Sequence, residues 1–139
     1  GGNESVDKST NIPKYKEKYR QGIRNFRAGR PEASCLIMTP ADHRERYRGV
    51  YITSRNFKRI IQAQQELAVE EGCAYFDLFQ AMGGDGSITE WRKKGWASGD
   101  YIHMNKGGSN ELGDIFYRAL MKGFADWLVK NPSPSPANP

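Results

Sequence analysis

Apolar residues spaced three and four positions apart predict three long amphipathic helices. The first is expected over residues 13–28, with Pro13 at the first helical position. The second is expected over residues 54–72, with Ser54 as its N-cap. The third is expected over residues 109–130, where apolar residues cover more than half of the circumference, so we expect protein to cover most of it. The expected buried faces are Ile12, Tyr15, Tyr19, Ile23 and Phe26 in the first helix, and Phe57, Ile60, Ile61, Gln64, Leu67 and Ala68 in the second.

Two short apolar runs between these helices predict β-strands. They cover residues 33–39, which Pro40 closes, and residues 73–79, which are apolar except for Asp77. Continuous apolar runs of this length are typical of strands that are buried on both faces in a parallel sheet. The connecting segments are a polar, arginine-rich loop at 41–49, a glycine-rich turn at 82–87 and a short helix at 88–93.

The order helix, strand, helix, strand, small helix, helix predicts an α/β domain with a parallel sheet. Two strands make a sheet too narrow to cover the helix faces that the pattern offers. We therefore expect further strands of the same sheet to precede Gly1.

Composition and charge narrow the class of protein. The 139 residues suit one domain, and no apolar run is long enough for a membrane span. The net charge of +5 is concentrated in the first helix, which is either a solvated surface or a site for an anionic partner. No aromatic platform motif, zinc pattern or phosphate loop accompanies it, so nucleic acid is not the expected partner. The basic residues are Lys14, Lys16, Lys18, Arg20, Arg24, Arg27 and Arg30.

Two smaller features leave alternatives open. Cys35 and Cys73 each stand at the start of a predicted strand, either as small buried thiols or as a single disulfide. The end of the chain, residues 131–139, is a Pro/Ser-rich tail that can form no core.

The candidate chemistry lies in residues 97–108, a loop that contains glycines and precedes the last helix. It places Asp100 three residues before His103. A carboxylate that accepts a hydrogen bond from one imidazole nitrogen fixes the tautomer and leaves the other nitrogen free to act as a general base. The pair supplies two of the three members of a nucleophilic triad.

Three short blocks, taken together, resemble the C-terminal half of the SGNH hydrolases, the GDSL-type esterases and acylhydrolases. Gly1-Gly2-Asn3-Glu4 is similar to the block whose asparagine donates to the oxyanion hole. Residues 37–42 resemble the strand and loop that follow it. The last strand, glycine loop and DxxH block of the family are matched by residues 75–79, 81–87 and 100–103, with Trp91 between them.

This resemblance implies a flavodoxin-like three-layer α/β/α fold, of which the chain supplies about two strands and three main helices. Residues 1–130 would be the C-terminal part of the hydrolase domain. His103 would be the general base, Asp100 its orienting carboxylate and Asn3 an oxyanion-hole donor, with no metal or cofactor required. The nucleophilic serine would lie in a GDS block outside this chain. Ser87, in Gly-Asp-Gly-Ser, has an extra glycine and is not the expected nucleophile.

The expected function is hydrolysis of short acyl groups, acetyl above all, from a carbohydrate in a periplasmic or secreted setting. The expected partners are the acylated carbohydrate, or another ester, and the missing N-terminal half, in the same protein or as a second chain. The alternative is a noncatalytic SGNH-like module that uses the basic helix at 14–30 to bind an anionic glycan or partner.

Overall fold

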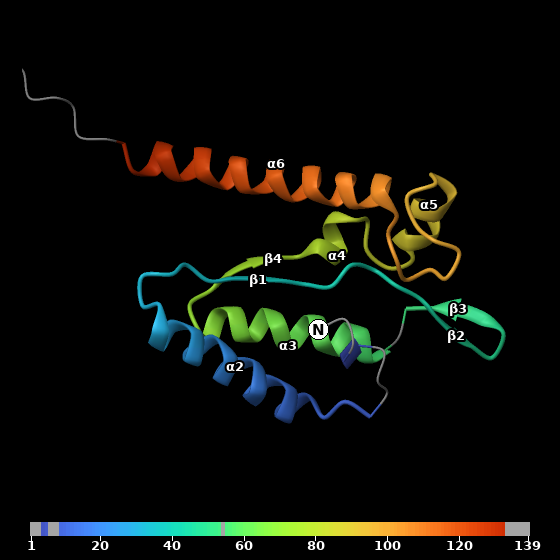
Figure 1. Ribbon diagram of the computed structural model, residues 1–139, viewed down its shortest axis with the longest axis horizontal. Helices are drawn as coiled ribbons and strands as arrows, with labels where there is room; N and C mark the ends of the chain where they lie inside the picture. The colour runs from blue at the N-terminus through green and yellow to red at the C-terminus, as the bar shows by residue number, and fades with distance from the viewer. Residues whose placement is uncertain (1–3, 6–8, 54, 133–139) are drawn as a thin grey trace, which may run out of the picture.

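The computed structural model describes residues 4–5, 9–53 and 55–132, which form an α/β fold in three layers. Figure 1 shows helix α6 on one side of the strands β1 and β4, with α3 and then α2 on the other side. The elements are α2 (Ile12–Gly29), β1 (Leu36–Met38), β2 (Glu45–Tyr47), β3 (Val50–Ile52), α3 (Arg55–Glu70), β4 (Ala74–Phe76), α4 (Leu78–Ala81), α5 (Ser87–Lys93) and α6 (Lys106–Lys130). None of the helices in the described part of the chain has the length and apolarity needed to cross a membrane.

The central sheet is parallel, as predicted. β1 pairs with β4, with Leu36 opposite Ala74 and Met38 opposite Phe76. Helix α3 connects the two strands and packs against one face of the sheet, with Ile37 against Leu67. The predicted α/β class is therefore confirmed.

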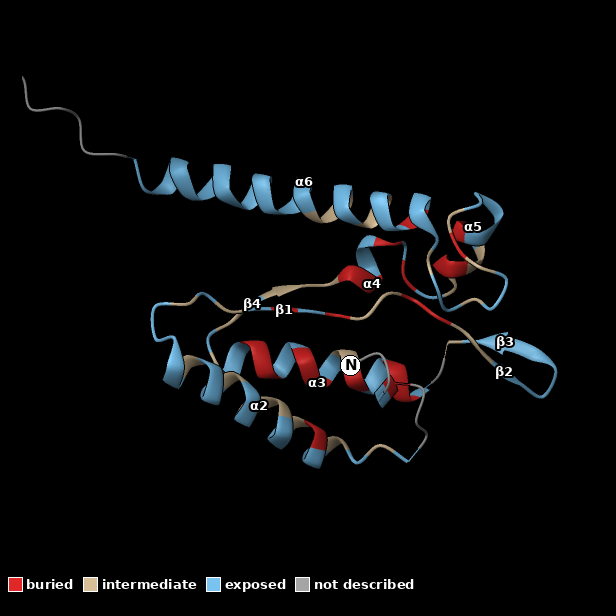
Figure 2. Ribbon diagram, in the orientation of Figure 1, coloured by how far each residue is buried: buried red, intermediate tan, exposed pale blue. Residues whose placement is uncertain are grey.

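Buried residues lie along one face of α3 and also on α4, α5 and the segment after β1, as Figure 2 shows. The expected face of α3 is buried, except that Ile61 is only half-buried. The expected N-cap, Ser54, lies outside the described residues. Each fully buried aliphatic or aromatic side chain stabilises the fold by about 1.5–3 kcal/mol relative to the exposed side chain. The largest apolar side chains with almost no exposure are Phe57, Ile37, Ile60, Leu67 and Ile88.

The basic side of α2 is paired with the acidic residues of α3. Helix α2 begins at a good cap, because the Asn11 side chain accepts a hydrogen bond from the Lys14 amide at 2.9 Å. The ion pairs join Lys16 to Glu66 and Glu70, Arg20 to Glu17, Glu70 and Glu71, and Arg24 to Glu71. These pairs hold α2 beside α3. They also neutralise Lys16, Arg20 and Arg24, three of the basic residues that would have to bind an anionic partner on this helix.

The segment after β1 is a hairpin, so the prediction of a loop over residues 41–49 is wrong from Glu45 onward. β2 and β3 pair antiparallel, with Arg46 opposite Tyr51 and Tyr47 opposite Val50. The turn between them places Arg48 at φ 48° and Gly49 at φ 87°. Two successive residues with positive φ make a tight turn whose twist matches that of the strands.

The second predicted strand is also shorter than expected, because Asp77 ends it. β4 stops at Phe76, and the Asp77 side chain then caps α4 by accepting a hydrogen bond from the Gln80 amide at 3.0 Å. The same carboxylate accepts a hydrogen bond from the Thr39 hydroxyl at 3.3 Å. The apolar residues Leu78 and Phe79 are therefore buried on a short helix rather than on a strand.

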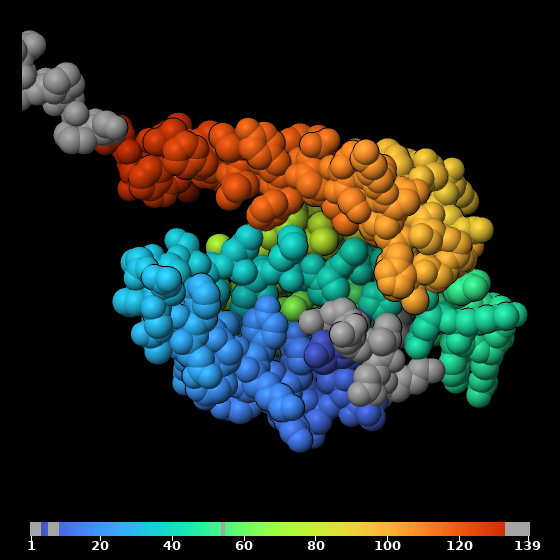
Figure 3. All heavy atoms as spheres, viewed as in Figure 1, coloured from blue at the N-terminus to red at the C-terminus, as the bar shows by residue number. Residues whose placement is uncertain are grey.

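Three expectations about burial are wrong. Phe26, expected on the buried face of the first helix, is 62% exposed. β1 is not buried on both faces, because Leu36 and Met38 are 45% and 46% exposed. Helix α6 is not largely covered: it contacts the sheet where Phe116 meets Phe76, and Gly108 is its one buried residue. Farther along α6, Figure 3 shows a gap between the helix and the rest of the described residues. The first half of α6 packs on the cluster that includes Leu78 and Ile88, through Leu112 and Ile115, whereas Leu120, Phe124, Trp127 and Leu128 farther along are exposed.

The two cysteines form a disulfide. Cys35 and Cys73 lie just before β1 and β4, and their bond joins the N-terminal ends of the two parallel strands. The sequence left a disulfide and two free thiols as alternatives. The structure selects the disulfide.

Replacing both cysteines by serine should destabilise the domain. The bond closes a loop with a sequence separation of 38 residues, so its loss should lower the free energy of unfolding by about 3–4 kcal/mol. Urea denaturation of the double variant beside the oxidised wild type measures this difference. Reduced wild type is the control and should match the variant, whereas equal midpoints for oxidised and reduced wild type would contradict the prediction.

Candidate active site

The DxxH segment forms a closed loop between α5 and α6. Ala97 and Met104 form an isolated antiparallel bridge, and the Ser98 amide donates to the His103 carbonyl at 2.8 Å. Beneath the loop lies an apolar cluster made by α4, α5 and the first half of α6. The loop therefore rests on a packed base while its tip, residues 99–103, stays at the surface.

Asp100 and His103 contact each other as the sequence predicts. The Asp100 Oδ2 atom lies 2.7 Å from His103 Nδ1. The other carboxylate oxygen accepts hydrogen bonds from the backbone amides of Ile102 at 2.9 Å and His103 at 3.0 Å. With Nδ1–H donating to the carboxylate, Nε2 carries the lone pair that a general base needs.

The charge state of Asp100 suits this arrangement. The hydrogen bonds from the His103 ring, the His103 amide and the Ile102 amide lower the pKa of Asp100 to about 2. The His103 side chain is 75% exposed, so a reacting group can reach it. The pair is therefore an ionised carboxylate holding an accessible imidazole in one orientation.

Tyr101, between the two, fixes the path of the loop. Its φ of 59° is unusual for a residue with a side chain, and such a conformation persists only where the surroundings impose it. The Arg44 amide donates to the Tyr101 carbonyl at 3.0 Å, and Arg92 donates to the Tyr101 hydroxyl at 2.8 Å. The Tyr51 ring contacts the Tyr101 ring with centroids 4.5 Å apart. Contacts from the hairpin side and from α5 thus hold this backbone.

The start of α6 locks the other end of the loop. Asn105 caps the helix by accepting a hydrogen bond from the Gly108 amide at 3.1 Å, and its side-chain nitrogen donates to the Gly95 carbonyl. Gly108 lies so close to the Trp96 carbonyl that a methyl group on its Cα would overlap the oxygen. The absence of a side chain at Gly108 is therefore what lets α6 approach the loop.

Asp42 is a buried carboxylate whose role the sequence analysis missed. It has no exposed surface and follows β1. It accepts hydrogen bonds from the Ile88 amide at 3.0 Å, the Thr53 hydroxyl at 3.1 Å and the Ser87 hydroxyl at 3.4 Å. Burial raises the pKa of Asp42, and the hydrogen bonds from Ile88 and Thr53 partly offset the effect. The only sequence signal is an acidic residue two positions after the proline that ends an apolar run.

The second histidine, His43, belongs to the core. Its Nε2 atom lies 3.2 Å from the Ser5 hydroxyl, its Nδ1 atom lies 3.4 Å from the Ala41 carbonyl, and its ring packs edge-on against Phe57. Burial lowers the pKa of His43. The Ser5 side chain is fully buried, so this serine and histidine have no access to a substrate.

The remaining site predictions fall in two groups. Ser87 is buried at the start of α5 and bonded to Asp42, as a structural residue would be. Asn3 lies outside the described residues, so its place relative to His103 is not defined. Among the residues that the structure describes, no three His, Cys, Asp or Glu side chains are grouped as metal ligands would be.

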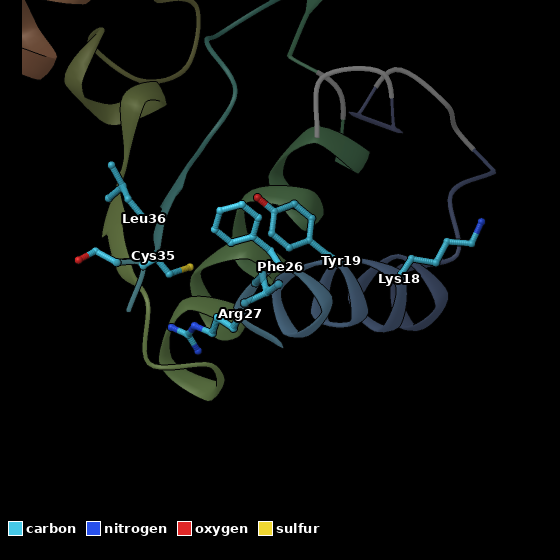
Figure 4. Close-up of a pocket in the computed structure, with 10 residues that line it drawn as sticks. Lys18, Tyr19, Phe26, Arg27, Cys35 and Leu36 are labelled. Carbon is cyan, nitrogen blue, oxygen red and sulfur yellow. The ribbon is translucent and has the colours of Figure 1, made fainter. Parts of the chain in front are cut away.

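A pocket of about 430 Å³ lies between α2 and the start of β1, and it is lined by residues of α2, by residues 33–35 and by Leu36. Figure 4 shows Tyr19 and Phe26 projecting from α2 on the side of Leu36. Neither Asp100 nor His103 borders it. No residue of β4 lines the pocket, and β4 is the only described strand that pairs with β1.

Comparison with known proteins establishes the fold. A solved structure described as "Peptidoglycan O-acetylesterase in action, 5 min" matches with a TM-score of 0.79 and 23% identity, over 88% of this chain and 35% of that chain. The esterase domain of the ORF1 protein from the zebrafish ZfL2-1 retrotransposon matches with a TM-score of 0.55 and 17% identity, over 81% of this chain and 61% of that one. This chain thus spans about a third of the first structure and about three fifths of the second. No protein-family model matches the sequence, and a search of curated proteins finds no match.

Substitution of Gly108 by alanine should destabilise the domain. The added methyl group would force α6 away from Trp96, so we expect a loss of about 2–3 kcal/mol in the free energy of unfolding. Gly113→Ala is the matched control, because nothing lies within 4 Å of the new methyl group. It should stabilise α6 by up to about 1 kcal/mol. Similar effects of both substitutions in chemical denaturation would contradict the close approach.

The buried His43 should make the fold sensitive to acid. Its pKa is lower in the folded state than the usual value of 6.5, so the unfolded chain binds more protons as the pH falls below 6.5. The contribution of neutral His43 to stability is therefore complete above this pH and is lost below it. Wild type should lose more stability than His43→Gln between pH 7.5 and 5.5, as measured by denaturation at each pH. Parallel pH curves would show that His43 does not titrate differently on folding.

Proposed function

We propose that this chain is the part of an SGNH-type serine esterase that carries the general base and its orienting carboxylate. The supporting observation is the 2.7 Å contact between Asp100 Oδ2 and His103 Nδ1 on an accessible loop. The fold, which is similar to that of two esterases, places this loop in an α/β domain of the appropriate class. His103 is the general base and Asp100 is its orienting carboxylate.

The reaction begins when His103 Nε2 takes the proton of a serine hydroxyl as its oxygen attacks the ester carbonyl. The Asp100 carboxylate stabilises the imidazolium that forms. When the tetrahedral intermediate collapses, His103 gives this proton to the leaving alcohol, and an acyl-enzyme remains. Water then attacks the acyl-enzyme with the same assistance, which releases the acid and restores the serine.

The serine comes from a segment outside this chain, either in the same protein or in a second chain. Ser5 and Ser87 are buried and engaged in hydrogen bonds within the fold. Asn3 is proposed as an oxyanion-hole donor, because a neutral amide there would stabilise the developing negative charge.

The serine-bearing half is proposed to pack on the open side of the sheet. The targets for further strands and helices would be the edge of β1 with which no described strand pairs, the exposed Leu36 and Met38, and the exposed apolar residues of α6. Exposed apolar surface of this extent is typical of an interface. The first matched structure is also almost three times longer than the part that this chain covers.

The proposed substrate is an acetyl or other short acyl ester of a carbohydrate. Its support is the fold shared with a structure whose description names a peptidoglycan O-acetylesterase. The disulfide between Cys35 and Cys73 supports an oxidising compartment and hence a periplasmic or secreted enzyme. The competing idea of glycan binding by α2 is weaker, because Lys16, Arg20 and Arg24 already pair with glutamates.

Substitution of Asp100 by asparagine should abolish most of the esterase activity. An asparagine cannot hold the imidazole in the required tautomer, so kcat should fall by about 10⁴-fold. The assay uses 4-nitrophenyl acetate and the complete enzyme, meaning this chain together with the segment that supplies the serine. Ser87→Ala is the control and should retain kcat, since Ser87 contacts Asp42 rather than the reacting groups.

Labelling with a fluorophosphonate checks the origin of the nucleophile. The adduct should map by mass spectrometry to a serine outside residues 1–139, and His103→Ala should slow its formation. An adduct on Ser87, or full activity in Asp100→Asn, would contradict the proposed assignment.

A further inference from the structure

The hairpin β2–β3 presents an aromatic and cationic surface next to the candidate active site. Tyr51 on β3 contacts Tyr101, which lies between the two members of the Asp100–His103 pair. The guanidinium of Arg92 lies 4.8 Å from the centre of the Tyr101 ring. Arg92, Tyr101 and Tyr51 therefore form a row of contacting groups that runs from α5 to the hairpin.

Tyr51 is the member of this row at the hairpin end, where its ring is exposed to solvent. The residue is 41% exposed and therefore accessible to a ligand. Arg46 stands directly opposite Tyr51 in the antiparallel register, so the two side chains share one face of the hairpin. Arg46 is exposed, and in the described part of the chain no carboxylate pairs with it.

The charges around this surface favour an anion. Glu45 pairs with Ile52 and therefore lies on the other face of the hairpin. The carboxylate of Asp100 is committed to His103 and to two backbone amides. Arg46 is thus the side chain that offers a positive charge to a ligand beside Tyr51. The Arg92 guanidinium already donates a hydrogen bond to the Tyr101 hydroxyl.

The position of the hairpin is fixed relative to His103. The Arg44 amide, one residue before β2, donates to the Tyr101 carbonyl, and Thr53, one residue after β3, donates to Asp42. Figure 3 shows the hairpin and the loop before α6 adjoining on the surface. A ligand that lies on Tyr51 would therefore lie next to the loop that carries Asp100 and His103.

We propose that Tyr51 and Arg46 bind the carbohydrate portion of the substrate and select a sugar that carries a carboxylate. The apolar C–H face of the sugar ring packs on the Tyr51 ring, and the Arg46 guanidinium binds the carboxylate. Both groups act on the alcohol side of the ester, away from the bond that breaks. This assignment rests on the proposed esterase function and adds its substrate selectivity.

The test compares two acetylated oligosaccharides in the complete enzyme. One is an acetylated oligogalacturonide, which carries carboxylates, and the other is an acetylated xylo-oligosaccharide, which is neutral. Arg46→Gln should raise KM for the oligogalacturonide by about three- to fivefold, the size expected for an exposed ion pair, and leave kcat nearly unchanged. It should leave KM for the neutral substrate unchanged. Tyr51→Ala should raise KM for both substrates.

Arg59→Gln is the matched control, because Arg59 is an exposed arginine of α3 outside the hairpin. It removes the same charge and should change neither KM. Equal effects of Arg46→Gln and Arg59→Gln, or equal effects of Arg46→Gln on the two substrates, would overturn the selectivity. If the wild type hydrolyses 4-nitrophenyl acetate but neither oligosaccharide, the selectivity fails while the esterase proposal stands. If it hydrolyses no ester, the esterase proposal itself fails.

Discussion

The buried carboxylate of Asp42 joins the parts of the chain on which the candidate site depends. A carboxylate without solvent contact is costly unless donors surround it, and Asp42 has donors from two distant segments. Thr53 belongs to the end of the hairpin, and Ser87 and Ile88 begin α5. Because α5 leads into the DxxH loop and the hairpin contacts Tyr101, one side chain after β1 sets the relative position of both. The sheet thereby determines where His103 lies, although His103 does not contact it.

The sequence predicted the elements that depend on local periodicity. The bounds of α2, α3 and α6 agree with the pattern to within three residues, because apolar residues recur on one face at every turn. The Asp100–His103 contact was also predictable, since a carboxylate three residues before a histidine can bond its amide and its ring within one turn. Both are short-range features.

The features that the sequence missed depend on distant partners or on backbone conformation. The hairpin was hidden because Arg48 occupies a positive φ that is typical of Gly or Asn, inside an arginine-rich run. The hydrogen bonds of Asp42 join residues 11 to 46 positions apart, which no local pattern reveals. The exposure of α6 could not be predicted for a different reason. An apolar face predicts that something covers it, but not that the cover is found among these 139 residues.

Helix α6 is the longest helix described, and its first turn is anchored to the loop that carries His103. Its 25 residues span about 37 Å, and its first turn is locked by the Asn105 cap and by the contact of Gly108 with Trp96. Beyond Phe116 the helix has few supports. A partner that packs along the exposed half of α6 would therefore contact the same helix that begins three residues after His103.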